Sequence, residues 1–432
     1  NSYYCNKLLC RFCNWHGNLF SYMRKVTILF FLCLLVGIVI AQPSQTIIIN
    51  EDSIQKVKAD SINKLAESPD FIHVSLLWVS AGNKVYTASG HSALRLECPS
   101  NNLDITYTFE MNLSMGSIMQ FFNGTAPAGY VSAPTQMFID SYRKEGRGIK
   151  AIKLNLSPRE KQNLWKYLDS EFEKGPQWKF DYMHNGCSSM TVNALYQCLD
   201  DGSEIDFRNF EDFKDSSYRG VLPDLFMLSP WVHLFWNGIM GTDGEESKPF
   251  EGKLYPAVLF RESQHMVVID SLHNERSLTI GDAYELKKAE TTDVPFPVTP
   301  TICFGILCLL AIVATITEYK YGYHTLQRVT DIILLSIQTL PGIGLLYLLL
   351  FSQQVGTSWN WLVIAFNPLP LLTWLTVRKK KGIYMKCKTV MATALLIFML
   401  CYPFIPQLHY NALMLLCSSF VIRLISVRFI NR

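Results

Sequence analysis

The chain has 432 residues, of which 49% are hydrophobic and only 17% are charged. This composition is rich in apolar residues and poor in charge for a soluble protein of this length, which argues against a wholly soluble chain. The net charge of +3 is small, so it gives no reason to expect a nucleic-acid partner. The length leaves room for about two or three domains, and the apolar residues are concentrated at the two ends of the chain.

The N-terminal part of the sequence has the pattern of a secretory signal peptide. A basic Met-Arg-Lys at 23–25 precedes the apolar run 26–41, which ends in Val-Ile-Ala. A basic region, an apolar core and a small residue at the cleavage point are the parts of such a signal. We therefore predict a signal peptide over 23–41, cleaved after Ala41. A retained membrane anchor is the alternative.

The segment 1–22 contains Cys5, Cys10, Cys13 and His16, which are residue types that bind metals. Because the segment lies upstream of the predicted signal peptide, we interpret it as the product of a start codon assigned too early. We therefore expect it to take no part in the fold.

Residues 42–297, about 255 in number, are enough for one sizeable core. The stretch 71–80 (FIHVSLLWVS) is rich in aromatic and β-branched residues, which predicts a strand. After the turn signal at 82–83, a second strand is expected to begin at His91, and a third is expected over 104–112.

Two helices are predicted further along this region. Ser157 can cap a helix in which Pro158 takes the first position and Glu160 closes a capping box. Cys187, in the stretch FDYMHNGCSSMTV, stands where extended residues give way to a second helical pattern. The region is therefore expected to have an α+β fold.

Three cysteines fall in this region, at Cys98, Cys187 and Cys198. An odd number leaves at least one thiol unpaired in an oxidising compartment. A disulfide between Cys98 and Cys198 would leave Cys187 free, and three free thiols are equally compatible with the sequence.

Cys187 is the candidate nucleophile. The N-terminus of a helix carries unpaired N–H groups and a partial positive charge, and both stabilise a thiolate. The same N–H groups can bind the oxyanion of a tetrahedral intermediate. The structural alternative is that Cys187 is a small buried apolar residue.

The candidate base is His91, because a side chain at the start of a strand can face a helix N-terminus across the end of the sheet. His184 is close to Cys187 in sequence, but we expect it to point elsewhere. His73 lies within an apolar strand and is expected in the core. Two further histidines of the region are His233 and His265.

A third residue is needed to orient the imidazole of the base. The third predicted strand offers Glu110, Asp104 and the hydroxyl of Tyr107. We name Glu110 as the candidate, although a structural role is open for each of the three.

The C-terminal region, 298–432, has the pattern of a membrane domain. Spanning a bilayer takes about 17–25 apolar residues. Five apolar runs follow one another at 298–317, 329–351, 361–377, 389–404 and 408–426. We therefore predict an all-α membrane domain of about five spans, of which the third is short and interrupted by Asn367-Pro368.

Basic residues alternate between the loops of this region. They follow the first, third and fifth runs, at Lys320, Arg328, 378–381, Arg428 and Arg432 among others, whereas the loops after the second and fourth runs have none. Basic loops remain in the cytoplasm. Residues 42–297 are therefore expected outside the cytoplasm, on the side that the signal peptide also predicts.

Four stretches resemble the lipoprotein N-acyltransferase Lnb family: SGHSALRL at 89–96, TYTFEM at 106–111, IKLNLSPREK at 152–161 and FDYMHNGCSS at 180–189. The chain departs from the family pattern at 185–186, where Asn-Gly replaces Asp-Asn, and in its third strand. The order of histidine and then cysteine is also similar to permuted papain-like enzymes of the lecithin retinol acyltransferase type.

The resemblance implies a permuted papain-like domain, with an antiparallel sheet packed on helices. It implies that Cys187 attacks an acyl ester of a membrane phospholipid and forms a thioester, with His91 as base. The acceptor would be the α-amine of a diacylated lipoprotein. No cofactor or metal is implied, and the expected location is the inner membrane, multi-pass, with the catalytic domain in the periplasm.

Two other functions use the same residues. A cysteine peptidase or amidase of the cell wall would need the same Cys/His pair, but not the membrane domain. A binding protein of the envelope would leave the thiol idle.

Overall fold

The computed structural model describes residues 72–82, 87–111, 117–181, 183–207, 217–222, 229–245, 255–290, 298–405, 407 and 410–426. The expectations for the segment 1–22 and for the signal peptide at 23–41 lie outside these residues. The same holds for the first part of the predicted 42–297 domain.

A seven-stranded antiparallel sheet is the centre of the N-terminal described domain. Its strand order is β10-β5-β1-β2-β3-β4-β6, and a separate three-stranded sheet has the order β7-β8-β9. The strands are β1 His73–Val79, β2 His91–Cys98, β3 Leu103–Met111, β4 Pro127–Pro134, β5 Ile149–Leu154, β6 Trp178–Lys179, β7 Glu204–Asp206, β8 Val267–Ile269, β9 Glu275–Ser277 and β10 Thr279–Lys287. The three strands predicted from the sequence are confirmed as β1, β2 and β3.

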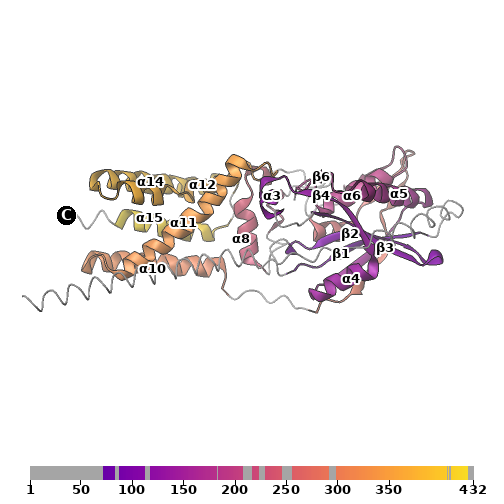
Figure 1. The fold of residues 1–432 in the computed structure, drawn as a ribbon, viewed down its shortest axis with the longest axis horizontal. Helices are drawn as coiled ribbons and strands as arrows, with labels where there is room; N and C mark the ends of the chain where they lie inside the picture. Colours follow the sequence, from indigo (N-terminus) through magenta and orange to yellow (C-terminus); the bar gives the residue numbers. More distant parts are fainter. Residues whose placement is uncertain are drawn as a thin grey trace, which may run out of the picture. The chain divides into compact units, whose positions relative to one another are not determined.

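Helices cover both faces of the large sheet, because successive side chains of a strand point to opposite faces. On β2, Leu94 and Leu96 belong to the main core with α5 and α6, whereas Ala93 packs with Phe138 of α4. Figure 1 shows α4 on one side of β1–β3 and both α5 and α6 on the other. These helices are α4 Thr135–Lys144, α5 Pro158–Lys174 and α6 Cys187–Cys198, and α9 Pro256–Glu262 also contacts β1 and β2.

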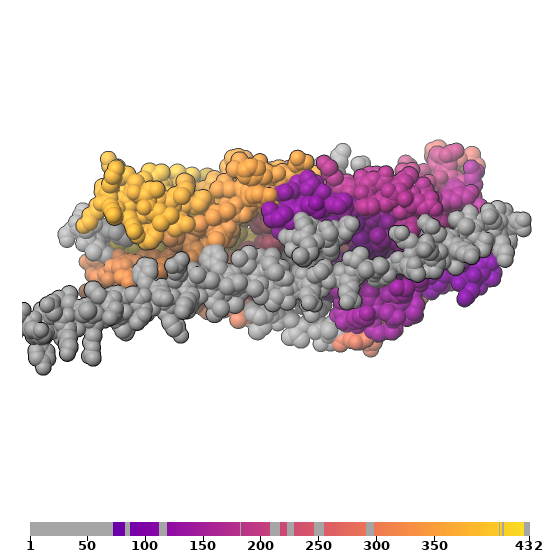
Figure 2. Space-filling view, viewed as in Figure 1, coloured from indigo at the N-terminus to yellow at the C-terminus, as the bar shows by residue number. Residues whose placement is uncertain are grey.

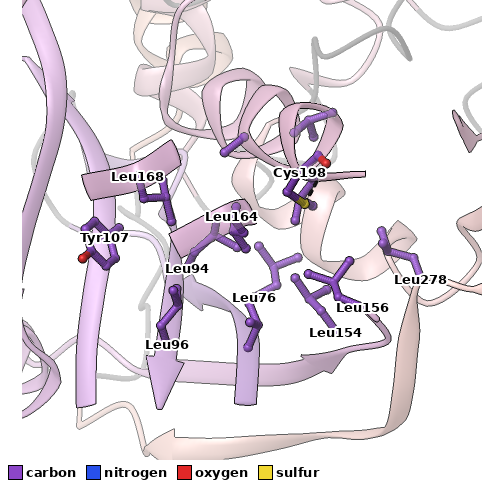
Figure 3. Close-up of a cluster of buried hydrophobic side chains, with 14 of the residues drawn as sticks. Leu76, Leu94, Leu96, Tyr107, Leu154, Leu156, Leu164, Leu168, Cys198 and Leu278 are labelled. Carbon is purple, nitrogen blue, oxygen red and sulfur yellow. Dashed lines mark hydrogen bonds between the residues drawn. The ribbon is translucent and has the colours of Figure 1, made fainter. Parts of the chain in front are cut away.

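The main core is formed by the sheet face under α5 and α6. Leu76, Leu94 and Leu96 of the sheet meet Leu164 and Leu168 of α5 there (Figure 3). Each of these leucines is at most 1% exposed. Fully burying one such side chain contributes about 1.5–3 kcal/mol, so this layer fixes α5 and α6 against the strands.

The start of α5 is as predicted from the sequence. Ser157 Oγ accepts the N–H of Glu160 at 3.2 Å, and Glu160 Oε2 accepts the N–H of Ser157 at 2.7 Å. With Pro158 at the first position, this is a complete capping box.

The disulfide suggested for Cys98 and Cys198 is wrong, because both thiols are free and buried. Cys98 lies beside Ser100, and the Cys198 thiol donates to Leu195 O within its own helix. Burial raises the pKa of Cys198 to about 12. Of the two possibilities that the sequence left open, free thiols are the one observed.

The C-terminal region is helical and apolar, which confirms the α+β domain followed by an all-α membrane domain. Its helices are α10 Pro300–Tyr321, α11 Thr325–Phe351, α12 Leu362–Ala365, α13 Leu369–Val377, α14 Lys381–Cys401 and α15 Ala412–Ser426. Among the described residues, 3 helices are long and apolar enough to cross a membrane, at 300–321, 325–351 and 381–404. The stretches 362–377 and 412–426 are shorter apolar helices, so two of the five predicted spans fall below that length.

Apolar side chains face outward on these helices, as a lipid-facing surface requires. Helix α14 forms a continuous yellow surface on the face seen in Figure 2. Its exposed apolar residues are Ile383, Val390, Leu396, Ile397 and Leu400.

The end of α3 (Ser117–Asn123) contacts the membrane domain directly. The Tyr347 hydroxyl donates to Asn123 Oδ1 at 2.5 Å, and the Ser352 hydroxyl donates to Phe122 O at 2.5 Å. Because α3 connects β3 to β4, this contact ties one end of the sheet to the end of α11.

A second contact is made by α8 (Pro230–Ile239). Trp231 and Leu234 pack against the apolar core of the membrane helices, and the Trp231 ring lies 6.0 Å from that of Phe304. The opposite face of α8 packs Val232 toward the N-terminal domain.

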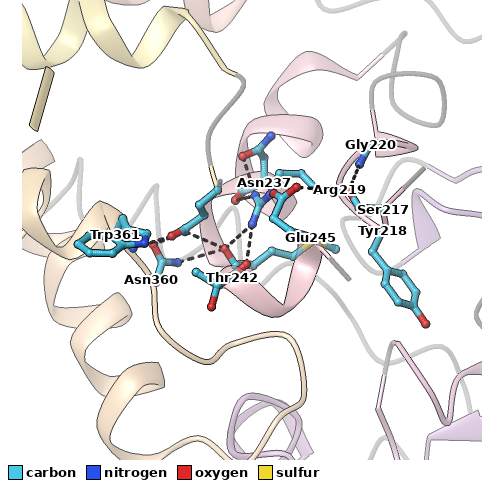
Figure 4. Close-up of polar contacts among 12 residues, drawn as sticks. Ser217, Tyr218, Arg219, Gly220, Asn237, Thr242, Glu245, Asn360 and Trp361 are labelled. Atoms are coloured by element: carbon cyan, nitrogen blue, oxygen red, sulfur yellow. Dashed lines mark hydrogen bonds and ion pairs between the residues drawn. The ribbon is translucent and has the colours of Figure 1, made fainter. Parts of the chain in front are cut away.

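Arg219 fixes the segment that follows α8 (Figure 4). Its side chain is fully buried and pairs with Glu245 at 2.5 Å. It also donates to the backbone carbonyls of Met240 and Gly241 and to both the backbone and side-chain oxygens of Asn237, at 2.6–2.9 Å. The buried charge is therefore fully surrounded by acceptors.

Two amides of the membrane domain bind the same segment. Asn360 Nδ2 donates to Gly238 O at 2.8 Å, and Gln407 Nε2 donates to Met240 O at 2.9 Å and to Asn360 Oδ1 at 2.6 Å. The Asn360 side chain therefore bonds to the backbone of the segment that follows α8, so this polar group of the membrane domain has hydrogen-bond partners.

Candidate active site

The thiol of Cys187 lies at the N-terminus of α6, as predicted. Gly186 precedes the helix with extended backbone, and its N–H donates to Ser189 Oγ at 2.9 Å. The first intrahelical bond runs from Met190 N–H to Gly186 O. Cys187 is thus the first helical residue, where backbone N–H groups and the helix dipole favour negative charge.

The imidazole of His91 lies close enough to this thiol to change its pKa, both through its charge and as a hydrogen-bond partner. Burial alone raises the pKa of Cys187, but the positive charge of His91, this hydrogen bond and the hydrogen bonds from the Ser92 backbone and hydroxyl outweigh it. The pKa of the thiol therefore falls to about 7. At neutral pH about half of the molecules carry the thiolate.

The pKa of His91 moves in the opposite direction. Burial lowers it, but the Cys187 thiolate, the hydrogen bond to it and the charge of Glu110 raise it by more, while Arg147 opposes them. The net result is a pKa above the ordinary value. The two shifts together favour a thiolate–imidazolium pair.

The other side of the imidazole contacts β3. Nε2 of His91 lies 2.5 Å from Thr108 Oγ1 and 3.7 Å from Glu110 Oε1. The Thr108 hydroxyl also lies 3.2 Å from Ser92 O, to which it donates its only proton. Its oxygen therefore accepts from Nε2–H, which leaves Nδ1 for the proton of the thiol.

The register of β2 and β3 explains these contacts. Ala93 pairs with Thr108, so the same antiparallel register continued by two pairs brings His91 opposite Glu110. All four side chains are on one face of the sheet. Glu110, predicted as the orienting residue, thus lies beside the ring, but its side chain is 45% exposed and the shorter contact is made by Thr108.

The two other residues considered for this position lie elsewhere. Asp104 forms a bidentate pair with Arg95, at 2.7 Å and 2.8 Å, near the far end of the strands. The Tyr107 hydroxyl donates to Asp169 on the opposite face. Neither contacts His91.

Two of the remaining histidines, His184 and His73, are bound or placed away from Cys187. His184 Nδ1 is 3.0 Å from Asp181 Oδ2, so it is held within the turn before α6. His73 is at the opposite end of β1 and is exposed, so the expectation that it lies in the core is wrong.

Thr108 and Ser92 are the residues of the site that the sequence did not reveal. Both are small hydroxyl residues within strands, where such residues are common. Side chains alternate between the two faces along β3, so Thr108 shares a face with Glu110, two positions further on. This alternation is the sequence signal that could have identified Thr108.

The site lies at the end of the sheet that is tied to the membrane domain. Strand β1 ends at Val79, opposite His91, and β3 ends at Met111, six residues before α3 begins at Ser117. The contacts of α3 with α11 are therefore made at the end of the sheet where β2 begins with His91 and β3 ends. Among the residues that the structure describes, no group of three His, Cys, Asp or Glu side chains is placed to hold a metal ion.

Comparison with protein families gives two matches. Residues 62–206 match the model of the Lnb N-terminal periplasmic domain, and residues 290–432 match the model of the Lnb transmembrane domain. Searches of curated proteins and of solved structures found no match.

Proposed function

The chain belongs to the Lnb family, and we propose that it is a cysteine-dependent acyltransferase that moves a fatty acyl chain from a phospholipid to the α-amine of a diacylglyceryl-cysteine lipoprotein. The two family matches identify a membrane protein with a periplasmic domain and a lipoprotein N-acyltransferase-like role. The acyl donor, the acceptor and the roles of individual residues belong to the proposal.

One observation gives the main support for this proposed reaction. A thiol with a pKa of about 7 is paired with an imidazole at the sheet end that is joined to apolar helices of membrane-spanning length. A nucleophile fixed beside the bilayer surface is suited to substrates that cannot leave the bilayer. This position also favours the transferase over a wall peptidase, whose substrate lies outside the bilayer.

In the first half-reaction, Cys187 Sγ attacks the ester carbonyl carbon of the phospholipid. The tetrahedral intermediate collapses when the His91 imidazolium gives its proton to the departing glycerol oxygen. The products are a thioester on Cys187, a lysophospholipid and a neutral imidazole. The N–H groups at the start of α6 are suited to bind the oxyanion.

In the second half-reaction, the lipoprotein amine attacks the thioester carbonyl. Neutral His91 takes a proton from the attacking nitrogen, and the thiolate of Cys187 leaves. The product is an amide, and the thiolate–imidazolium pair is restored. Thr108 and Glu110 support His91 in both protonation states through Nε2.

We place the enzyme in the inner membrane with its catalytic domain in the periplasm, because diacylated lipoproteins and phospholipids meet at that surface. The partners proposed are therefore a phospholipid donor, a diacylated lipoprotein acceptor and the bilayer itself. Atoms and charges balance in both half-reactions with these substrates, Cys187 and His91 alone.

The test uses membranes that contain the full chain and a phospholipid labelled in its acyl chains. We expect a labelled protein adduct that neutral hydroxylamine removes, because thioesters are cleaved under these conditions. Cys187→Ser should lack the hydroxylamine-sensitive adduct. Label on a water-soluble wall fragment would instead support a peptidase or amidase, and a thiol that no alkylating agent modifies would support a binding protein.

A further inference from the structure

Tyr142 lies on the face of the sheet that carries His91, although it belongs to α4 and is distant from His91 in sequence. Phe138, one turn earlier on α4, is buried against the face that carries Ala93, and its ring is 4.9 Å from that of Tyr142. The Tyr142 ring centroid is in turn 6.4 Å from that of His91. The spacing of four residues on one helix thus brings the phenol to the start of β2.

The end of α4 fixes this ring. Gly146 has a left-handed φ of 70°, and its N–H donates to Arg143 O, while the N–H of Arg147 donates to Tyr142 O. These two bonds form a Schellman motif, which folds the chain back over the last helical turn. The Arg147 guanidinium consequently lies over the Tyr142 ring, 4.7 Å from its centroid.

Arg147 is itself held firmly. Its side chain is buried, Nε donates to Ser80 O at 2.7 Å, and Nη1 pairs with Glu145 at 3.2 Å. Ser80 follows Val79, the residue paired with His91. Arg147, which lies over Tyr142, is therefore attached to the end of β1 that pairs with His91.

The phenol shares one electrostatic environment with the reacting groups. Burial raises the pKa of Tyr142, and the negative charges of Glu110 and Cys187 raise it further, while Arg147 lowers it. The hydroxyl therefore keeps its proton when Cys187 is ionised. A neutral phenol beside a thiolate is a hydrogen-bond donor, and a cation over the ring makes its O–H more acidic.

We propose that the Tyr142 hydroxyl donates a hydrogen bond to the carbonyl oxygen of the acyl group when that oxygen becomes an oxyanion. The donor acts in both half-reactions, because each forms a tetrahedral intermediate on Cys187. In each step the carbonyl π pair moves to oxygen as sulfur or nitrogen attacks, and returns when the leaving group departs. Tyr142 is a catalytic residue in this scheme, and Arg147 is a positioning residue.

This inference rests on the proposed function only in requiring that Cys187 is acylated. The probe is a p-nitrophenyl fatty-acyl ester with the full-length enzyme in detergent, which reports acylation through p-nitrophenol release and requires no lipoprotein. A second readout is alkylation of Cys187 by iodoacetamide, in which no oxyanion forms.

Tyr142→Phe should slow acylation by about 100-fold or more, the effect of removing one oxyanion donor. Its alkylation rate should stay within about twofold of the parent, because an intact ion pair sets the thiolate fraction. Tyr167→Phe is the matched control, since its hydroxyl accepts from Asn193 on the opposite face. Arg147→Met should give an intermediate loss in acylation.

Acylation of Tyr142→Phe within about threefold of the parent would overturn the role of Tyr142, as would a parallel loss of alkylation. A parent enzyme that takes no acyl group on Cys187 would overturn the proposed function as well. A parent that is acylated but leaves lipoproteins unchanged would overturn the acceptor alone and leave the assignment of Tyr142 standing.

Discussion

The His91 ring is hydrogen-bonded to the Thr108 hydroxyl across the β2–β3 pair, with Nε2 2.5 Å from Oγ1. Since Thr108 donates its own proton to Ser92 O, it can only accept from His91. This contact orients the ring and fixes the proton on Nε2. Orienting the imidazole is usually the role of one carboxylate or amide. Here the buried Thr108 hydroxyl and the half-exposed Glu110 carboxylate share that role.

Thr108→Val should therefore impair the site more than Glu110→Gln. A hydrogen bond to a charged ring contributes about 1.5–3 kcal/mol, which corresponds to a loss of about 10–150-fold in kcat/KM. The exposed Glu110 pair contributes about 0–1 kcal/mol, a loss below about fivefold. Steady-state kinetics with the p-nitrophenyl ester measures both.

Thr106→Val removes a hydroxyl from the same face of β3, where it pairs with Thr135, and serves as the control for loss of a buried hydroxyl. If Glu110→Gln proves the more damaging of the two substitutions, the carboxylate rather than the hydroxyl orients His91.

The reactivity of Cys187 should depend on pH through its pKa of about 7. Below that value the thiolate is protonated and alkylation slows about tenfold per pH unit, whereas above it the rate reaches a plateau. In His91→Ala the positive charge is lost and burial remains, so the inflection should move upward to about 8.5 or higher. Iodoacetamide modification of the Cys187 peptide, followed by mass spectrometry across the pH range, gives the curve.

Cys198 provides an internal control in the same samples, since its buried thiol has a pKa of about 12 and should stay unmodified. An inflection that remains near 7 in His91→Ala would show that the helix N-terminus, and not the imidazole, lowers the thiol's pKa.

Gly90→Ala should disturb the site through the backbone. Gly90 has a left-handed φ of 83°, and an added Cβ would lie 2.7 Å from Val79 O. The strand start must then shift, and His91 shifts with it. We expect acylation to fall by about tenfold or more, with about 1 kcal/mol lost from the free energy of unfolding.

Gly281→Ala is the matched control, because Gly281 has a φ of 70° but no atom within 4 Å of an added Cβ. It should lose similar stability and keep its activity. Equal activity of the Gly90 and Gly281 variants would exclude the proposed displacement of His91.

Arg219→Met should loosen the contact between the two domains. The substitution leaves several buried carbonyl oxygens and Glu245 without their cation, which costs about 3–5 kcal/mol. Arg219→Lys should be intermediate, since Lys cannot reproduce the forked contacts. Thermal unfolding in detergent reports the loss of stability.

The same variant should lose acyl transfer from phospholipid vesicles more than it loses reaction with the soluble ester, because the active site is no longer held at the membrane domain. An Arg219→Met protein that unfolds at the temperature of the parent would contradict this view of the buried cluster.

The parts of the site that the sequence predicted are those encoded locally. The capping residues of α5 and the aromatic pattern of β1 each depend on a few neighbouring residues. For the same reason, the helix start at Cys187 and the strand start at His91 were found without knowledge of the fold.

The residues that escaped prediction depend on register and on packing. Thr108 reaches His91 because of the pairing of β2 with β3, while Tyr107, one position away, faces the other side of the sheet. Tyr142 reaches the site only because α4 covers that face. The Cys98–Cys198 pairing failed for a similar reason, since sequence spacing carries no information on the distance between two buried thiols.

The most direct test of acyl transfer to lipoproteins is the mass of lipoprotein N-termini in cells that contain the parent protein, Cys187→Ala or neither. We predict an N-terminal peptide heavier by one acyl chain with the parent protein only, the added chain being amide-linked and resistant to hydroxylamine. Identical masses in all three samples would contradict it.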